Sequence, residues 1–240
     1  MRPFLSNADR QEVQRFFEER LQQPVRLISF TRKRTLMQRL ALERAHYCEE
    51  TRQLLQDLDD LSDLVSIEFK DVTAQPEVMQ AYRMRFTPGT AIMNEHDVGV
   101  RHYGIPVGYE LSTFLEHIAS VSNPDSGLSE ASKADVATIR WPIHIQVFGS
   151  PTCPFCPVAS QLANRFAIES DYIRVDSIDV AEFPEVVQRY NVRGVPRVVI
   201  NDDVSFVGAT HEQHFLEQVM NAAALQRERW NGEAAPVDAV

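Results

Sequence analysis

The stretch that decides the fold is SPTCPFCP, residues 150–157, in which Cys153 and Cys156 are separated by two residues. The preceding residues, 143–148, alternate apolar and polar side chains, which predicts a half-buried strand. After it, apolar residues recur at steps of three and four up to residue 167, which predicts a helix. The two cysteines therefore lie where a strand of the core passes into a helix.

The predicted helix start gives the first cysteine a physical reason to ionise. We expect Cys153 at or next to the N-cap, where unpaired N–H groups and the helix dipole favour an anion. Pro154 is compatible with the first helical turn because that position needs no N–H. Thiols in such settings have pKa values of roughly 3.5 to 7.5 instead of about 8.5. Cys153 can then attack a substrate disulfide, and Cys156, one turn later, can resolve the mixed disulfide.

Two other interpretations of the cysteine pair compete with redox catalysis. A structural zinc ion needs four ligands, and the chain has one further cysteine, Cys48. The histidine pair His211 and His214 lies in a different predicted helix. A purely structural disulfide is the second alternative. The spacing of the two cysteines favours redox catalysis.

A second segment, YNVRGVPRVVIN at residues 190–201, predicts a helix end, a glycine turn and a strand. With this segment and the CPFC stretch, the chain resembles the protein disulfide oxidoreductases, which are two-unit glutaredoxin-like proteins of the thioredoxin fold. The resemblance implies that Val195 and Pro196 form a cis-proline loop facing the active site. A proline that merely starts an edge strand is the alternative. The residues expected to bind substrate are Pro154, Phe155, Val195 and Pro196.

An internal repeat divides the chain into two similar halves. PEVMQAY at residues 76–82 matches PEVVQRY at residues 184–190, with an offset of 108 positions. The same offset pairs Pro88 with Pro196. The chain therefore carries two copies of one structural unit.

The first unit lacks an attacking cysteine. The repeat offset pairs Cys48 with Cys156 and Ala45 with Cys153, so AHYC replaces CPFC. Without the first sulfur this unit cannot form its own disulfide. We therefore predict a vestigial, redox-inactive site formed by Ala45, Cys48 and Pro88.

The first unit also contains an insertion. Residues 25–30 match residues 143–148 at an offset of 118, which leaves ten extra residues between Phe30 and Ala45. This stretch is rich in helix formers, so we predict a helix that starts near Arg34 and places Cys48 in its interior. Away from a helix N-terminus, Cys48 would be an ordinary buried cysteine.

Turn-forming residues at 122–127 mark the boundary between the units. We predict a redox-inactive unit at 1–122, an active unit at 123–230 and a flexible tail at 231–240. Each unit shows the order α-β-α-β-α-β-β-α. The predicted fold class is α/β: two tandem thioredoxin-like folds with mixed central sheets flanked by helices, and with outer strands paired across the boundary.

One feature of many thioredoxins is absent from this chain. They carry a buried carboxylate six residues before the attacking cysteine, where this chain has Val147. The candidates by sequence for proton transfer with Cys156 are Glu169 and Asp171. The alternative is that both are solvated surface carboxylates.

Composition argues against several kinds of partner. The formal net charge of −10 argues against sequence-independent nucleic-acid binding, which needs a basic surface. No apolar run approaches membrane-spanning length, and the N-terminus shows no apolar leader. Three cysteines do not make a secreted disulfide scaffold. We expect a cytoplasmic protein.

We expect a thiol–disulfide oxidoreductase that acts on protein disulfides through Cys153 and Cys156, with no cofactor beyond this redox-active pair. A thioredoxin reductase-like flavoprotein would reduce it. A degenerate first unit beside an active second unit also resembles the N-terminal part of the alkyl hydroperoxide reductase flavoprotein, which implies electron delivery to a peroxiredoxin. The chain has no Gly-x-Gly-x-x-Gly fingerprint, so any flavin is expected on another chain. A different class, metal or iron–sulfur binding by two chains that each donate both cysteines, stays open.

Overall fold

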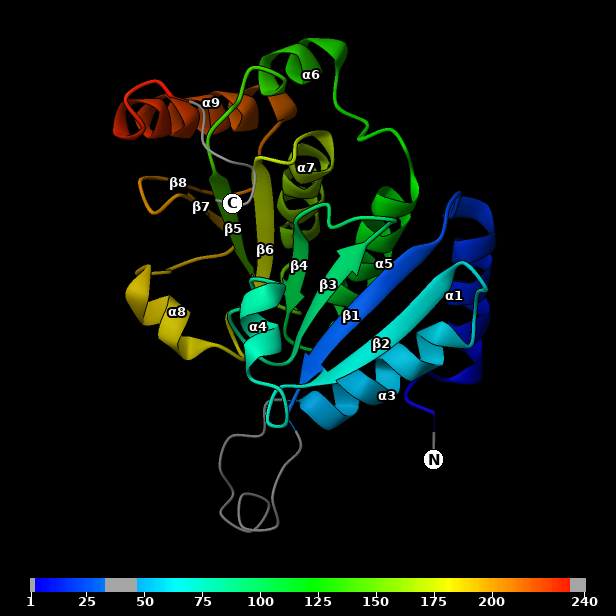
Figure 1. The fold of residues 1–240 in the computed structure, drawn as a ribbon. Coiled ribbons are helices and arrows are strands. Elements are labelled where there is room, and N and C mark those ends of the chain that lie inside the picture. Colours follow the sequence, from blue (N-terminus) through cyan, green and yellow to red (C-terminus); the bar gives the residue numbers. More distant parts are fainter. Residues whose placement is uncertain (1–2, 33–46, 234–240) are drawn as a thin grey trace.

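The computed structural model describes residues 3–32 and 47–233, which form one mixed sheet with helices on both faces (Figure 1). The strand order in this 8-stranded sheet is β2-β1-β3-β4-β6-β5-β7-β8. The first four strands in chain order fill one half of the sheet and the last four fill the other. The predicted fold class, with mixed sheets flanked by helices, is confirmed.

The first half of the chain forms a parallel β-α-β pair followed by a hairpin. Strands β1 and β2 are parallel, β3 is antiparallel to β1, and β3 and β4 are antiparallel. The bounds of its elements are α1 Asn7–Arg20, β1 Val25–Thr31, α3 Cys48–Asp59, β2 Val65–Asp71, α4 Glu77–Ala81, β3 Gly89–Met93, β4 Val100–Tyr103 and α5 Tyr109–Ser122.

The second half repeats this pattern. Strands β5 and β6 are parallel, β7 is antiparallel to β5, and β7 and β8 are antiparallel. The bounds are α6 Glu130–Val136, β5 Ile143–Gly149, α7 Cys156–Glu169, β6 Ile173–Asp179, α8 Pro184–Arg189, β7 Arg197–Ile200, β8 Val204–Val207 and α9 Glu212–Arg229.

Strand β4 pairs in parallel with β6 and joins the two halves. In this register Val100 lies opposite Val175, and His102 lies opposite Ser177. The predicted pairing of outer strands across the boundary is therefore confirmed. The pairing brings α5 of the first half into contact with α7 of the second.

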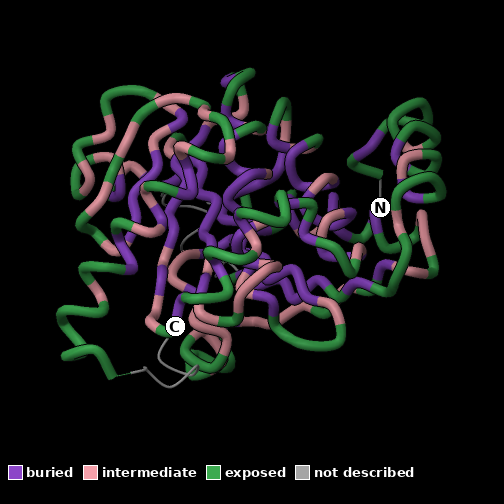
Figure 2. Tube along the Cα trace, turned by 90° about the horizontal axis from the view of Figure 1, so that it is seen from above, coloured by how far each residue is buried: buried purple, intermediate pink, exposed green. Residues whose placement is uncertain are grey.

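The core continues across this junction. One apolar cluster contains Phe114 and Ile118 of α5 together with Phe166 of α7 and Val175 of β6, all of them fully buried. Burying side chains of this size contributes about 1.5 to 3 kcal/mol each. Figure 2 shows buried residues running through the centre of the molecule, with exposed residues at its periphery. The division at residue 122 stays a prediction, because sheet and core pass through both halves.

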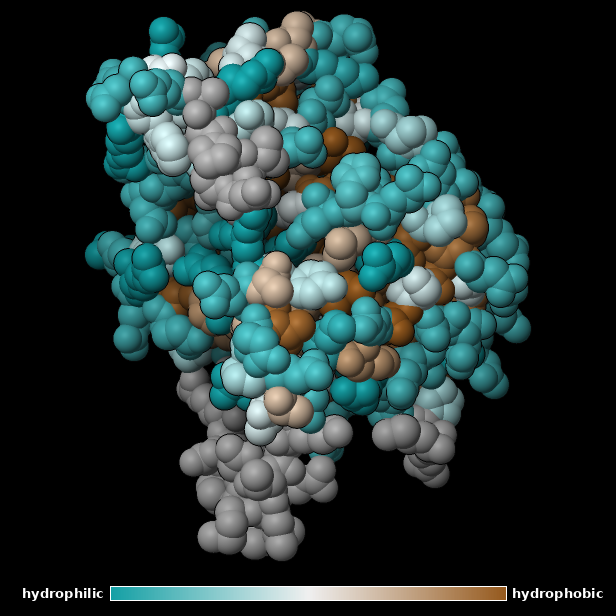
Figure 3. All heavy atoms as spheres, in the orientation of Figure 1, coloured by the Kyte–Doolittle hydropathy of each residue, from teal (hydrophilic) through white to brown (hydrophobic). Residues whose placement is uncertain are grey.

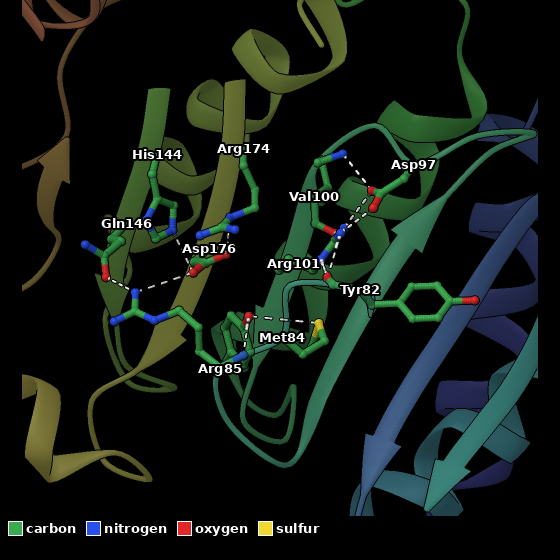
Figure 4. A network of polar contacts seen from close by, with 12 residues as sticks. Tyr82, Met84, Arg85, Asp97, Val100, Arg101, His144, Gln146, Arg174 and Asp176 are labelled. Carbon is green, nitrogen blue, oxygen red and sulfur yellow. Dashed lines mark hydrogen bonds and ion pairs between the residues drawn. The ribbon is translucent and has the colours of Figure 1, made fainter. Parts of the chain in front are cut away.

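Polar side chains also cross the junction, on the sheet face opposite α5 and α7 (Figure 4). Asp176 of β6 is fully buried and lies 2.7 Å from His144, 3.6 Å from Arg174 and 3.7 Å from Arg85 of the first half. Burial alone would raise the pKa of Asp176, but these cations outweigh it and lower the pKa to about 2. Arg85 also donates a hydrogen bond to Gln146.

The surface is mostly hydrophilic on the face seen in Figure 1, with scattered apolar patches (Figure 3). Over residues 3–32 and 47–233, no helix combines the length and the apolar character that a membrane span requires. Two predicted segments extend beyond the description: the proposed helix start near Arg34 and residues 234–240 of the predicted tail.

Ser122, the last residue of α5, ties that helix to the turn before β1. Its buried hydroxyl accepts hydrogen bonds from the backbone N–H groups of Gln22 and Gln23, each at 2.8 Å, and donates one to the Gln23 carbonyl at 2.6 Å. Ser122→Ala should therefore lower the free energy of unfolding by about 1 to 3 kcal/mol, measured by urea denaturation. Ser120→Ala on the same helix is the control, and an equal loss in both variants would contradict the assignment.

Candidate active site

The cysteine pair of the CPFC stretch is joined in the structure. Cys153 and Cys156 form a disulfide, with their Cα atoms 5.5 Å apart. Both are buried, with 7% and 5% of their surface exposed. Phe155 between them is 65% exposed, so the disulfide lies just beneath a protruding aromatic side chain.

The helix after the disulfide starts later than predicted. Helix α7 begins at Cys156 with Phe155 as its N-cap, so Cys153 lies two residues before the cap instead of at or next to it. Pro154 precedes the helix, and Pro157 occupies its first turn, where no N–H is needed. The electrostatic argument still holds, because the N–H of Cys156 donates to Sγ of Cys153 at 3.1 Å. A thiolate at Cys153 would receive this hydrogen bond and the field of the helix start.

The predicted substrate loop lies at the same end of the sheet. Phe148 of β5 is paired with Arg197 of β7, so Pro196 comes next to the point where β5 leads into the disulfide loop. The peptide bond between Val195 and Pro196 is cis. Substrate binding by Pro154, Phe155, Val195 and Pro196 stays a prediction.

A buried carboxyl group from the first half of the chain lies beside the disulfide. Gly149 separates the two: a Cβ built there would lie 3.4 Å from Oε1 of Glu110 and 3.7 Å from Sγ of Cys156. Glu110 is in the first turn of α5 and is 7% exposed. The carboxyl group that Val147 does not supply thus comes from a neighbouring helix.

Glu110 is held in its protonated form. Burial is the largest cause, and the carboxylates of Asp179 and Glu182 add to it, so the pKa of Glu110 rises to about 9. The pKa values of Asp179 and Glu182 are themselves raised, chiefly by burial, that of Glu182 to about 7. At neutral pH Glu110 is therefore an acid with a proton to give.

The sequence candidates for this role lie elsewhere. Glu169 ends α7, and the 14 residues of that helix, at about 1.5 Å each, place it about 20 Å from Cys156. It accepts a hydrogen bond from Ser126, and Asp171 follows two residues later. The prediction that Glu169 or Asp171 serves Cys156 is wrong. Sequence carried no signal for Glu110, because only the pairing of β4 with β6 brings it to the disulfide.

A backbone contact from the first half also holds the disulfide loop. The N–H of Tyr109 donates to the carbonyl of Pro151 at 2.9 Å. Gly108 has φ +58, and a Cβ there would lie 2.5 Å from the same carbonyl oxygen. This position therefore requires glycine, both for its backbone conformation and for its close approach.

Cys48 differs from its predicted placement. It is the first residue of α3, so the prediction that it lies in a helix interior is wrong. The inference that its thiol is not activated still stands, because burial raises the pKa of Cys48 more than the backbone N–H of Arg32 lowers it. Ala45 lies outside the described residues, and Pro88 follows Thr87 through a cis peptide bond. The vestigial site stays a prediction.

Metal ligands do not cluster in the part of the chain that the structure describes: no group of three or more His, Cys, Asp or Glu side chains there could hold an ion. Binding by two chains that each donate Cys153 and Cys156 is a separate hypothesis.

Comparison with known proteins identifies the family. Residues 143–221 match the family described as "Thioredoxin domain". The thioredoxin of Methanocaldococcus jannaschii is 37% identical over 78 residues, which make up 32% of this chain and 92% of that protein. This chain belongs to the thioredoxin family. Among solved structures, a protein disulfide oxidoreductase from Aeropyrum pernix is 26% identical with a TM-score of 0.82, covering 94% of this chain and 96% of that one.

This thioredoxin-family protein is also similar to an alkyl hydroperoxide reductase of Pseudomonas putida, with 23% identity over 218 residues. The match covers 90% of this chain but spans only 38% of the length of that reductase. Together with the Cys153–Cys156 disulfide, these relatives make the chain a thiol–disulfide oxidoreductase. The predicted family and activity are confirmed.

Burial should make Cys48 much less reactive than Cys153 in the reduced protein. A thiol with a raised pKa is almost wholly protonated at neutral pH, whereas Cys153 has a hydrogen bond to stabilise its thiolate. Limiting iodoacetamide at pH 7, followed by peptide mass spectrometry, should label Cys153 first. Denatured protein is the control, in which Cys48 should react readily. Equal labelling rates in the folded protein would contradict this assignment.

Proposed function

We propose that this oxidoreductase exchanges disulfides with protein substrates, with Cys153 as the attacking sulfur and Cys156 as the resolving sulfur. The observation that carries this assignment is the asymmetry of the two environments. Sγ of Cys153 accepts the N–H at the helix start, which favours a thiolate. Cys156 has the protonated carboxyl of Glu110 beside it, which favours a protonated thiol.

In the reductive half of the cycle, a thiolate of the reductant attacks Sγ of Cys153. The bond between Cys153 and Cys156 breaks, and the electron pair goes to Sγ of Cys156. Glu110 gives its proton to this leaving sulfur, so that the protein holds a thiol and a carboxylate instead of a buried thiolate. A second thiolate of the reductant then displaces Cys153 from the mixed disulfide.

In the oxidative half, the Cys153 thiolate attacks a disulfide of the substrate, and one substrate sulfur leaves. Cys156 returns its proton to the Glu110 carboxylate and attacks Sγ of Cys153. The second substrate sulfur is released, and two electrons have passed to the substrate. Glu110 thus holds one proton that alternates with Cys156 through the cycle.

We propose that exposed Phe155 and its neighbour Pro154 form one wall of the substrate groove. Val195 and Pro196 would form the other, where the backbone of Val195 can pair with an extended substrate segment. The first unit, residues 1–122, has no dithiol of its own but contributes Glu110 and the contact at Pro151. It is therefore part of the active site built on residues 123–230.

A second candidate is electron delivery to a peroxiredoxin. The observation that favours it is the match of 90% of this chain to the alkyl hydroperoxide reductase of Pseudomonas putida. In this version a flavoprotein supplies the electrons, and the redox-active disulfide is the protein's own cofactor. The proposed location is the cytoplasm. If two chains instead shared an iron–sulfur cluster, the purified protein would be coloured and would contain iron.

Cys153→Ser should abolish reduction of insulin disulfides, because no attacking sulfur remains. Cys156→Ser should accumulate a mixed disulfide with the substrate, because nothing resolves it. The assays are insulin turbidity and mass spectrometry of the trapped adduct. Cys48→Ser is the matched control and should keep wild-type activity. Persistent activity in Cys153→Ser would refute the assignment, and faster oxidation by a peroxiredoxin disulfide than by insulin would favour the second candidate.

Glu110→Gln should slow reduction of the Cys153–Cys156 disulfide by dithiothreitol roughly 100-fold at neutral pH, because the leaving sulfur loses its acid. The ratio of wild-type to variant rates cancels the titration of the attacking thiol. Since the pKa of Glu110 is about 9, the ratio should be high below pH 9 and fall toward one above it, where the carboxyl has lost its proton. A ratio that does not change with pH would exclude Glu110 as the acid.

A further inference from the structure

We propose that the cavity behind Cys156 binds one water molecule that connects Glu110 to His102, and that His102 is thereby a positioning residue for the proton transfer. This inference rests on the proposed role of Glu110 as the acid. His102 belongs to β4, so it too comes from the first half of the chain.

The cavity has the size and the lining that a single water needs. Its volume is about 20 Å³, and one water requires at least about 10 to 15 Å³ with two to four polar partners. Its polar lining comes from four residues besides Cys156. These are His102, Glu110, Ser160 and Ser177.

Buried polar atoms at this cavity lack partners within the described residues. Both ring nitrogens of His102 and Oε2 of Glu110 are buried without a hydrogen bond. Nε2 of His102 lies 3.9 Å from Oε2 of Glu110, which is too far for a direct hydrogen bond. Buried polar groups are almost always paired with protein or with ordered water, and one bridging water would satisfy both atoms.

The ring of His102 is held in place by its neighbours. Its centroid lies 5.2 Å from that of Phe114 and 6.5 Å from that of His117. Nε2 of His117 in turn lies 3.2 Å from the hydroxyl of Ser160, which contacts that of Ser177. The imidazole thus has a fixed direction toward the cavity.

The charge state of His102 suits a donor to a carboxylate. Burial lowers its pKa to about 4, so the ring is neutral at working pH, with one N–H and one lone pair. The pKa of His117 is also lowered, by burial and by His102. An N–H of His102 that donates to the water, which donates to Oε2 of Glu110, favours the ionised carboxyl.

This effect opposes the other groups that face Glu110. Burial, Asp179 and Glu182 all raise the pKa of Glu110, and Cys156 is the group that receives its proton. A carboxyl that never ionises cannot give its proton to Cys156 and take it back. His102, acting through the water, keeps the ionised state within reach.

The test is the pKa of Glu110 in the oxidised full-length chain, read from the infrared carboxylic-acid band that Glu110→Gln removes. His102→Leu deletes the donor and should raise that pKa by about one unit. His102→Gln keeps an N–H close to the place of Nε2 and should restore the wild-type value. The pH at which the reduction-rate ratio to Glu110→Gln falls should move by the same amount. An unchanged pKa in His102→Leu would overturn the proposal.

A second variant keeps the test decisive if His102→Leu does not fold. The Cβ of Gly149→Ala would enter the cavity at ordinary contact distance from Cys156 and Glu110 and exclude the water. It should raise the pKa of Glu110, and an unchanged or lowered value would overturn the proposal. Failure of the proposed function is distinct, because Glu110→Gln would then leave the pH dependence of disulfide reduction as in the wild type.

Discussion

The parallel pairing of β4 with β6 is the interaction on which the active site depends. It merges two four-stranded halves into one sheet and brings α5 against α7. Cys156 is the first residue of α7, and Glu110 lies in the first turn of α5. A contact between main chains at the centre of the sheet therefore sets which side chains meet at its end. The half without a dithiol supplies the acid to the half that has one.

The two faces of the junction treat buried charge in opposite ways. On one face Asp176 is surrounded by His144, Arg174 and Arg85, and its pKa is lowered to about 2. On the other face Glu110 has two further carboxylates nearby, and its pKa is raised to about 9. The first carboxylate is permanently ionised and contributes to structure. The second can change its protonation state, which is what a proton-transfer step requires.

Local patterns predicted the elements well because apolar periodicity and turn residues act within a few positions. Strands β1 and β5, the hairpins and the cysteine pair were all expected at these positions from the sequence. Helix starts were less secure. Helix α7 begins at Cys156, and Cys48 begins α3 instead of lying inside a helix. Burial, which depends on neighbours far along the chain, keeps Cys48 inactive where its position in the helix would not.

The sequence by itself determined the chemistry: two cysteines at a strand-to-helix junction can bond to each other and exchange with a substrate sulfur, and their spacing is a local property. It also determined that the first unit has no such pair. The tertiary structure alone decided which carboxyl serves Cys156. Glu169 and Asp171 are nearer in sequence, but a rigid helix of 14 residues holds them far from the sulfur. Glu110 is 46 positions away along the chain, and it reaches the disulfide because hydrogen bonds between β4 and β6 fold the two halves into one sheet.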